Sequence, residues 1–141
     1  MIVFMDTSAL FKLYVPEEES DDIDAMVNSN AEIVVSSVAY VEIHSAMGRR
    51  RREGSLKINE MDKLLGDFET HWFEFGKVPL DDVILKRAGT LCLKHPIRAL
   101  DAIQLASALH VRNQLEEPIV FFTADESLQA AARREKLVTH F

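Results

Sequence analysis

The chain alternates short apolar runs with longer segments in which apolar residues recur at helical spacing. Three runs, at residues 2–5, 33–35 and 119–122, predict strands buried on both faces, because polar residues do not alternate within them. Two weaker patterns, at residues 76–80 and 137–140, predict a short edge strand and a final strand. Together these segments predict a central sheet of about five strands.

Helices are predicted between the strands. They span about residues 7–14, 17–28, 38–52, 59–72, 82–93, 99–112 and 126–134. The segment 99–112 is apolar almost all round and should be deeply packed. Unalternating strands separated by helices favour a mostly parallel sheet with helices on both faces, which is an α/β fold with three layers, α/β/α.

Length and composition fit a single domain, residues 1–141, with a real hydrophobic core, since 48% of the 141 residues are hydrophobic. The longest apolar stretches are too short to cross a bilayer, and the N-terminus lacks a basic signal-like region. We therefore expect a cytoplasmic protein with no membrane partner. The one cysteine, Cys92, cannot form an internal disulfide.

The net charge is -7, from 16 Lys and Arg against 23 Asp and Glu. This balance argues against a nonspecific nucleic-acid binder, so any contact with nucleic acid must be local. The only dense basic run is 49–52, four arginines near a predicted helix end. Two interpretations stay open: stabilisation of the helix C-terminus, worth about 0.3 to 1 kcal/mol per charge, or contact with phosphate or a partner protein.

Four acids, Asp6, Glu42, Asp101 and Asp125, lie where an apolar segment passes into a helix start or its first turns. Carboxyl ends of parallel strands share one edge of a sheet, so we expect the four to meet there. Carboxylates brought together raise one another's pKa unless a cation lies between them. The pattern therefore predicts a metal site, although the helix dipole would explain any one acid alone.

Four motifs carry a resemblance to a known family. They are Val3-Phe4-Met5-Asp6-Thr7-Ser8-Ala9-Leu10, Ser36-Ser37-Val38-Ala39-Tyr40-Val41-Glu42, Arg98-Ala99-Leu100-Asp101-Ala102-Ile103-Gln104-Leu105-Ala106 and Phe122-Thr123-Ala124-Asp125-Glu126-Ser127-Leu128. In this order and spacing they resemble a PIN-domain ribonuclease, specifically a VapC-type toxin of a toxin–antitoxin pair. The resemblance spans nearly the whole chain and implies a PIN-like fold with all four acidic positions occupied.

The resemblance implies a metal-dependent endoribonuclease that hydrolyses transfer RNA or ribosomal RNA, with carboxylate-bound Mg²⁺ or Mn²⁺ activating water. The expected catalytic residues are Asp6, Glu42, Asp101 and Asp125. Asp6, Asp101 and Asp125 are the expected metal ligands, while Glu42 completes the shell or orients the attacking water. The sequence leaves open the exact RNA target and whether one ion or two operate.

The polar residues close in sequence to the four acids have two interpretations each. Thr7, Ser8 and Thr123 could fix the carboxylates by hydrogen bonds, or they could form only local caps and turns. Arg98, three residues before Asp101, could contact a substrate phosphate or be a surface charge.

The resemblance also implies partners: a cognate VapB-type antitoxin that places a basic side chain among the carboxylates, a homodimer, and a larger assembly with antitoxin bound. Two alternatives keep the PIN-like fold, namely a housekeeping RNA-processing nuclease and a non-catalytic binding module. A phosphoacceptor signalling module is disfavoured, because it needs an adjacent acid pair after the first strand and a lysine after the last core strand. This chain has Asp6-Thr7-Ser8 and Thr123-Ala124-Asp125 at those places.

Overall fold

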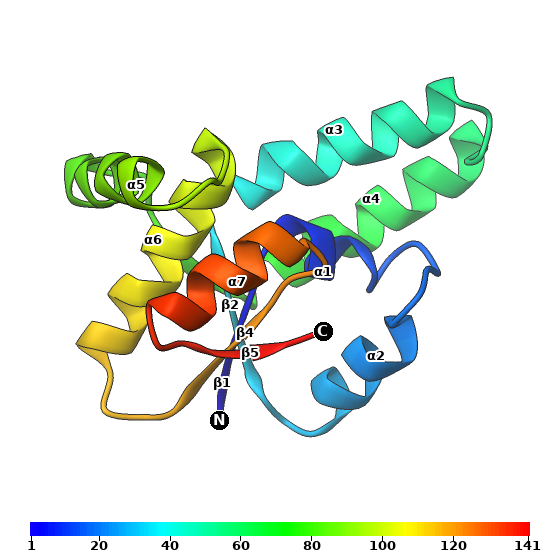
Figure 1. Ribbon diagram of the computed structural model, residues 1–141. Coiled ribbons are helices and arrows are strands. Elements are labelled where there is room, and N and C mark those ends of the chain that lie inside the picture. Colours follow the sequence, from blue (N-terminus) through cyan, green and yellow to red (C-terminus); the bar gives the residue numbers. More distant parts are fainter.

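A five-stranded sheet forms the centre of the protein in a computed structural model that describes residues 1–141 (Figure 1). The strands are β1 (Ile2–Met5), β2 (Glu32–Ser36), β3 (Gly76–Val78), β4 (Ile119–Phe122) and β5 (Val138–His140). Their order is β3-β2-β1-β4-β5, and every neighbouring pair is parallel. The predicted sheet is therefore confirmed, including the edge position of β3.

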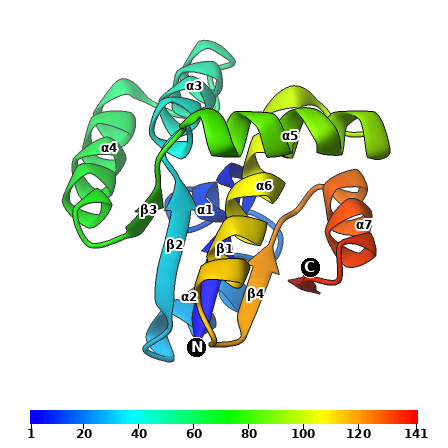
Figure 2. The ribbon, with the colours of Figure 1, turned by 90° about the vertical axis from the view of Figure 1, so that its left-hand side faces the viewer.

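Helices cover both faces of the sheet. They are α1 (Thr7–Phe11), α2 (Ser20–Asn28), α3 (Ala39–Arg52), α4 (Ile58–Trp72), α5 (Asp82–Lys94), α6 (Ala99–Gln114) and α7 (Glu126–Arg134). One buried cluster joins the sheet to α5, α6 and α7, and a second joins it to α1, α2, α3 and α4. Figure 2 shows α6 lying along the strands on one side. None of the helices combines the length and apolarity that a membrane span requires.

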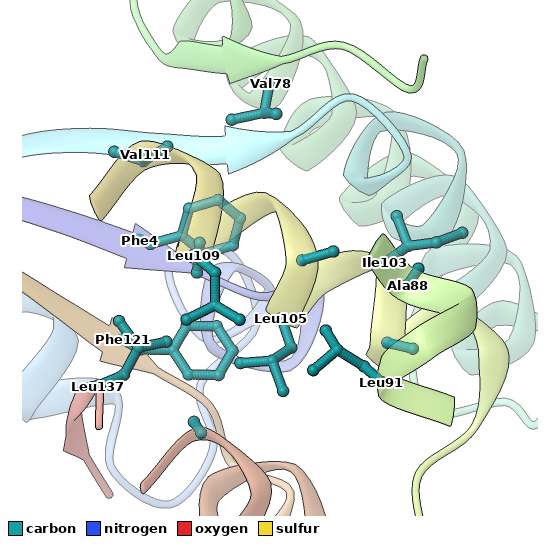
Figure 3. Packing of buried hydrophobic residues seen from close by; sticks show 14 of the residues in the cluster. Phe4, Val78, Ala88, Leu91, Ile103, Leu105, Leu109, Val111, Phe121 and Leu137 are labelled. Atoms are coloured by element: carbon teal, nitrogen blue, oxygen red, sulfur yellow. The ribbon is translucent and has the colours of Figure 1, made fainter. Parts of the chain in front are cut away.

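Strand β1 shows why the apolar runs do not alternate with polar residues. Ile2 and Phe4 belong to one buried cluster, while Val3 and Met5 belong to the other. Successive side chains of a strand point to opposite faces, so a strand covered on both sides has no polar position. In Figure 3, Phe4 lies near Leu109 of α6 in the first of these cores.

The order of the strands determines where a pocket can form. From β1 the chain first adds β2 and β3 on one side and later adds β4 and β5 on the other. The direction of winding thus reverses between β1 and β4, where open parallel sheets bind ligands beyond their carboxyl ends. The two strands pair in register from Ile2 to Met5, and the amide of Asp6 extends the ladder by donating to the carbonyl of Phe122 at 3.1 Å.

Three predicted boundaries differ from the structure. Helix α1 ends at Phe11 instead of continuing to residue 14, and α2 begins at Ser20 instead of residue 17. Helix α3 begins at Ala39, which places Glu42 in its first turn. All seven predicted helices nevertheless form.

The acidic residues before α2 form ion pairs outside the helix. Lys12, a buried lysine, lies 3.8 Å from a carboxylate oxygen of Glu17 and 3.7 Å from one of Glu19. Glu19 adopts a left-handed backbone, with a φ of 70°, immediately before the helix. Glu17, where the helix was predicted to begin, and Glu19 thus pair with Lys12 at the end of α1 and stay outside α2.

Substitution of two leucines, one buried and one exposed, tests how much packing in the helical layer contributes to stability. Leu105 of α6 is fully buried, whereas Leu93 of α5 is 93% exposed. We expect Leu105→Ala to lower the free energy of unfolding by about 2 to 5 kcal/mol, because it removes buried methyl groups and leaves a cavity. The matched change Leu93→Ala should stay within about 0.5 kcal/mol of the wild type. Urea unfolding followed by circular dichroism measures both; equal losses would contradict the packing described.

Candidate active site

An open pocket of about 1010 Å³ collects the predicted acids at the carboxyl edge of the sheet. Its lining includes all four acids, Asp6, Glu42, Asp101 and Asp125, together with Arg98. They come from the turn after β1, from α3, from the start of α6 and from the turn after β4. Residues separated by most of the chain are thus brought to one place, as expected from the parallel topology.

Asp6 is the most buried of the four acids, with 4% of its surface exposed. It is the N-cap of α1, and its Oδ1 accepts hydrogen bonds from the Ala9 amide at 3.0 Å and the Ser8 hydroxyl at 2.7 Å. Its Oδ2 accepts a hydrogen bond from the Thr123 hydroxyl at 2.5 Å. Uncharged donors therefore fix this carboxylate in place without neutralising it.

The hydroxyls of Ser8 and Thr123 also order the turn after β4. Ser8 Oγ accepts from the amide of Ala124 at 2.9 Å, and Thr123 Oγ1 accepts from the amide of Asp125 at 3.1 Å. Each hydroxyl thus contacts a carboxylate and stabilises a turn. The two interpretations that the sequence left open for these hydroxyls both apply.

Glu42 is held by a buried amide that sequence reasoning missed. Its Oε1 accepts from the Thr7 hydroxyl at 2.8 Å and from Nε2 of Gln104 at 2.9 Å. Gln104 is 2% exposed, and its Oε1 has no hydrogen-bond partner, which is rare for a buried polar atom. The available signal was a single long amide side chain in the apolar part of the predicted helix 99–112.

Asp125 and Asp101 present the more accessible oxygens. Asp125 is the N-cap of α7, and its Oδ1 accepts from the Leu128 amide at 2.8 Å while Oδ2 makes no hydrogen bond within the protein. Asp101 lies in the first turn of α6, is half-buried, and makes no side-chain hydrogen bond. Three oxygens on these two residues are therefore free to accept from a ligand.

The carboxylates affect one another electrostatically. Burial raises the pKa of Asp6 from its ordinary 3.8 to about 6, with a smaller contribution from Asp101, against the opposing effect of its three hydrogen-bond donors. The pKa of Asp101 is also raised, first by burial and then by Asp125, with Arg98 opposing and Glu42 adding to the rise. A cation among these groups would relieve that repulsion.

The donor set suits a hard divalent cation. The pocket offers carboxylate, hydroxyl and amide oxygens, with no His or Cys in its lining. As placed, no three acidic side chains lie close enough to hold an ion together. Mg²⁺ keeps several water ligands and takes only one or two protein carboxylates directly, so a preformed cluster is not required. The residues present therefore fit Mg²⁺ or Mn²⁺ in chemical type.

Sequence comparison places the chain among known proteins. The family model described as "PIN domain" matches residues 3–134. Ribonuclease VapC45 of Mycobacterium tuberculosis (strain CDC 1551 / Oshkosh) is 32% identical over 110 residues, which cover 78% of this chain and 76% of the relative. The matched residues include all four acids of the pocket.

Solved structures share the fold at lower sequence identity. Mycobacterium tuberculosis VapC20, described as a sarcin-ricin loop cleaving toxin, superposes with a TM-score of 0.67 and 13% identity, covering 92% of this chain and 94% of its own. A toxin-antitoxin complex from Klebsiella pneumoniae gives a TM-score of 0.61 and 17% identity, with coverages of 90% and 89%. The predicted PIN-like α/β/α fold is confirmed.

The raised pKa of Asp6 predicts a pH-dependent stability in metal-free protein. The folded state binds the Asp6 proton more tightly than the unfolded state does, so protonation of Asp6 favours folding. This stabilisation is fully present below about pH 4 and is lost as the pH rises through about 6. The rise in the pKa of Asp6 corresponds to a change of roughly 3 kcal/mol in the free energy of unfolding across this pH range. We expect Asp6→Asn, which cannot ionise, to lose this pH dependence and to be more stable than the wild type at pH 7.

Urea unfolding between pH 4 and 8 in the presence of EDTA measures this effect. The matched control is Asp81→Asn, since Asp81 is likewise an N-cap, of α5, but is exposed and outside the pocket. Asparagine is as good an N-cap as aspartate, so this control should keep the wild-type pH dependence. Parallel curves for Asp6→Asn and the wild type would show that Asp6 does not carry the effect.

Proposed function

The chain belongs to the PIN-domain family, and from this membership we propose that it is a metal-dependent endoribonuclease acting as the toxin of a toxin–antitoxin pair. The observation that carries the proposal is one pocket with four carboxylates from four parts of the chain, two of which have raised pKa values. The ribonuclease name of its relative at 32% identity supports the reaction class.

In this proposal Asp6, Asp101 and Asp125 hold Mg²⁺ or Mn²⁺, directly or through water. A cation held there would lower the pKa of a water molecule and offset negative charge on the phosphate. Glu42 has Oε1 anchored by Thr7 and Gln104, which leaves Oε2 to orient the attacking water or complete the metal shell. No side-chain nucleophile is needed for hydrolysis.

The proposed substrate is RNA, in a loop or single-stranded region of transfer RNA or ribosomal RNA. The open form of the pocket suits an exposed loop better than a buried small molecule. Arg98 is exposed at the N-cap of α6 and lowers the pKa of Asp101, so its charge reaches the carboxylates. We assign it to a contact with a substrate phosphate.

The proposed protein partner is a VapB-type antitoxin, with a homodimer of this chain in the larger assembly. Structural likeness to a toxin-antitoxin complex is consistent with this partner. A basic antitoxin side chain among the four carboxylates would form charge-assisted hydrogen bonds with the oxygens otherwise available to the metal. Inhibition would then follow from competition for one negatively charged pocket.

Asp6→Asn and Asp101→Asn test the catalytic assignment. We expect each to lower RNA cleavage in Mg²⁺ by on the order of 10² to 10³ or more, and to remove growth inhibition on expression, because each deletes a negative charge from the metal site. EDTA should abolish wild-type cleavage. Asp81→Asn is the control of equal chemistry outside the pocket and should cleave normally. Undiminished cleavage by the folded Asp6→Asn, Asp101→Asn double variant would refute the assignment.

Gln104 should act by positioning Glu42. We expect Gln104→Leu to lower kcat by about 10- to 100-fold with little change in KM, because loss of an orienting hydrogen bond has effects of this size at metal sites. The matched control is Gln114→Leu, an exposed position at the end of the same helix. Initial rates of cleavage over a range of RNA concentrations, with RNA in excess over protein, give kcat and KM for both variants. Equal rates for the two variants would leave Gln104 without a positioning role.

A further inference from the structure

The pocket extends from the carboxylates along α3 to a second, basic end. Seven residues of α3 and its C-cap line it: Val41, Glu42, Ser45, Ala46, Arg49, Arg50 and Glu53. Within this set Glu42 and Arg49 are seven residues apart, two helical turns, so they lie on the same face of α3 about 10 Å apart along its axis. One wall of the pocket thus has a carboxylate near one end and a guanidinium further along.

Two cations at the basic end already have partners. Arg50 Nη2 lies 2.5 Å from Glu17 Oε2, and its guanidinium lies 5.5 Å from the centre of the Phe11 ring. Lys12 lies within ion-pair distance of both Glu17 and Glu19. The Arg50 contacts join the segment after α1 to α3, and both cations are paired with carboxylates.

Arg49 differs from both. It is exposed to the pocket, and it forms no ion pair and no side-chain hydrogen bond. Glu53, one turn further along the same wall, is not within ion-pair distance of it. Arg49 is therefore an uncompensated cation in a pocket of a protein whose net charge is -7.

The four arginines of residues 49–52 lie on different faces of α3, and only Arg49 and Arg50 line the pocket. Arg51 and Arg52 are exposed and do not line the pocket. At about 100° per residue, Arg51 lies roughly half a turn around α3 from Glu42. All four arginines are in the last turn and experience the same helix dipole. The dipole therefore accounts for a basic helix end but not for the position of Arg49 in the pocket.

We propose that Arg49 binds a backbone phosphate of the RNA substrate, on the strand that flanks the phosphate being cleaved. The inference rests on the proposed ribonuclease function. A guanidinium presents a planar fork of donors that matches phosphate oxygens, and Arg49 has all its donors available. Its separation from Glu42 places the contact away from the reacting phosphate. Such a contact gives an acidic molecule local attraction for RNA without depending on base identity.

The test compares Arg49→Ala with Arg51→Ala, both in an Asp101→Asn background that prevents cleavage. Each loses one arginine from the same helical turn, so net charge and helix-dipole effects cancel in the comparison. Binding of a fluorescein-labelled, mixed-sequence single-stranded oligoribonucleotide is followed by anisotropy in MgCl₂ at several NaCl concentrations. Circular dichroism and thermal unfolding check that the variants are folded.

We expect Arg49→Ala to weaken binding about five- to tenfold at low salt, and to reduce the slope of log K against log salt by about 0.7, the value for one phosphate contact on a single strand. Arg49→Lys should keep the wild-type slope, because it retains the charge. Arg51→Ala should change affinity less than twofold. Equal effects of Arg49→Ala and Arg51→Ala would overturn the proposal.

A cleavage assay separates this inference from the function on which it rests. Protein with all four acids intact should cleave total RNA in Mg²⁺, with Arg49→Ala less efficient than Arg51→Ala at low RNA concentration. If this protein cleaves RNA and the two arginine variants are equal, only the role of Arg49 is refuted. If it neither binds nor cleaves RNA, the proposed function fails and the Arg49 contact fails with it.

Discussion

The chemistry of the pocket depends on one electrostatic constraint, because four like charges share it. Asp6, Glu42, Asp101 and Asp125 lie around one pocket, and none of them forms an ion pair with Lys or Arg within 4 Å. Where they are anchored, the donors are hydroxyls, amides and backbone N–H groups. An ion pair would fix an acid and also cancel its charge, whereas uncharged donors fix it and preserve the negative potential that a metal ion requires.

The parallel sheet makes this crowding possible. β1 and β4 are neighbours, so the turns that follow them bring Asp6 and Asp125 to the same edge, and the starts of α3 and α6 bring Glu42 and Asp101. The apolar strands and the two cores on either side of the sheet hold these turns in place. The stability of the cores therefore offsets the electrostatic cost of the pocket, in agreement with the raised pKa of Asp6.

The strands and the four acids could be predicted from the sequence because both depend on local patterns. A strand buried on two faces is a continuous apolar run, as in 119–122, and each acid follows such a run or opens a helix. Gln104 could not be assigned in this way, since its role depends on Glu42, 62 positions earlier in the chain. The predicted start of α2 was wrong for a similar reason, because Glu17, which lies outside the helix, pairs with Arg50, 33 positions later in the chain. Catalytic roles for the acids stay predictions.

The contact between Thr123 and Asp6 joins positions 117 residues apart. Because translation runs from the N-terminus to the C-terminus, Asp6 is made long before its hydroxyl donor Thr123 and its acidic neighbour Asp125. The pocket therefore cannot assemble on a partial chain that stops before β4. Such a partial chain lacks the assembled pocket, so the order of translation itself delays the appearance of the pocket until the turn after β4 has been made.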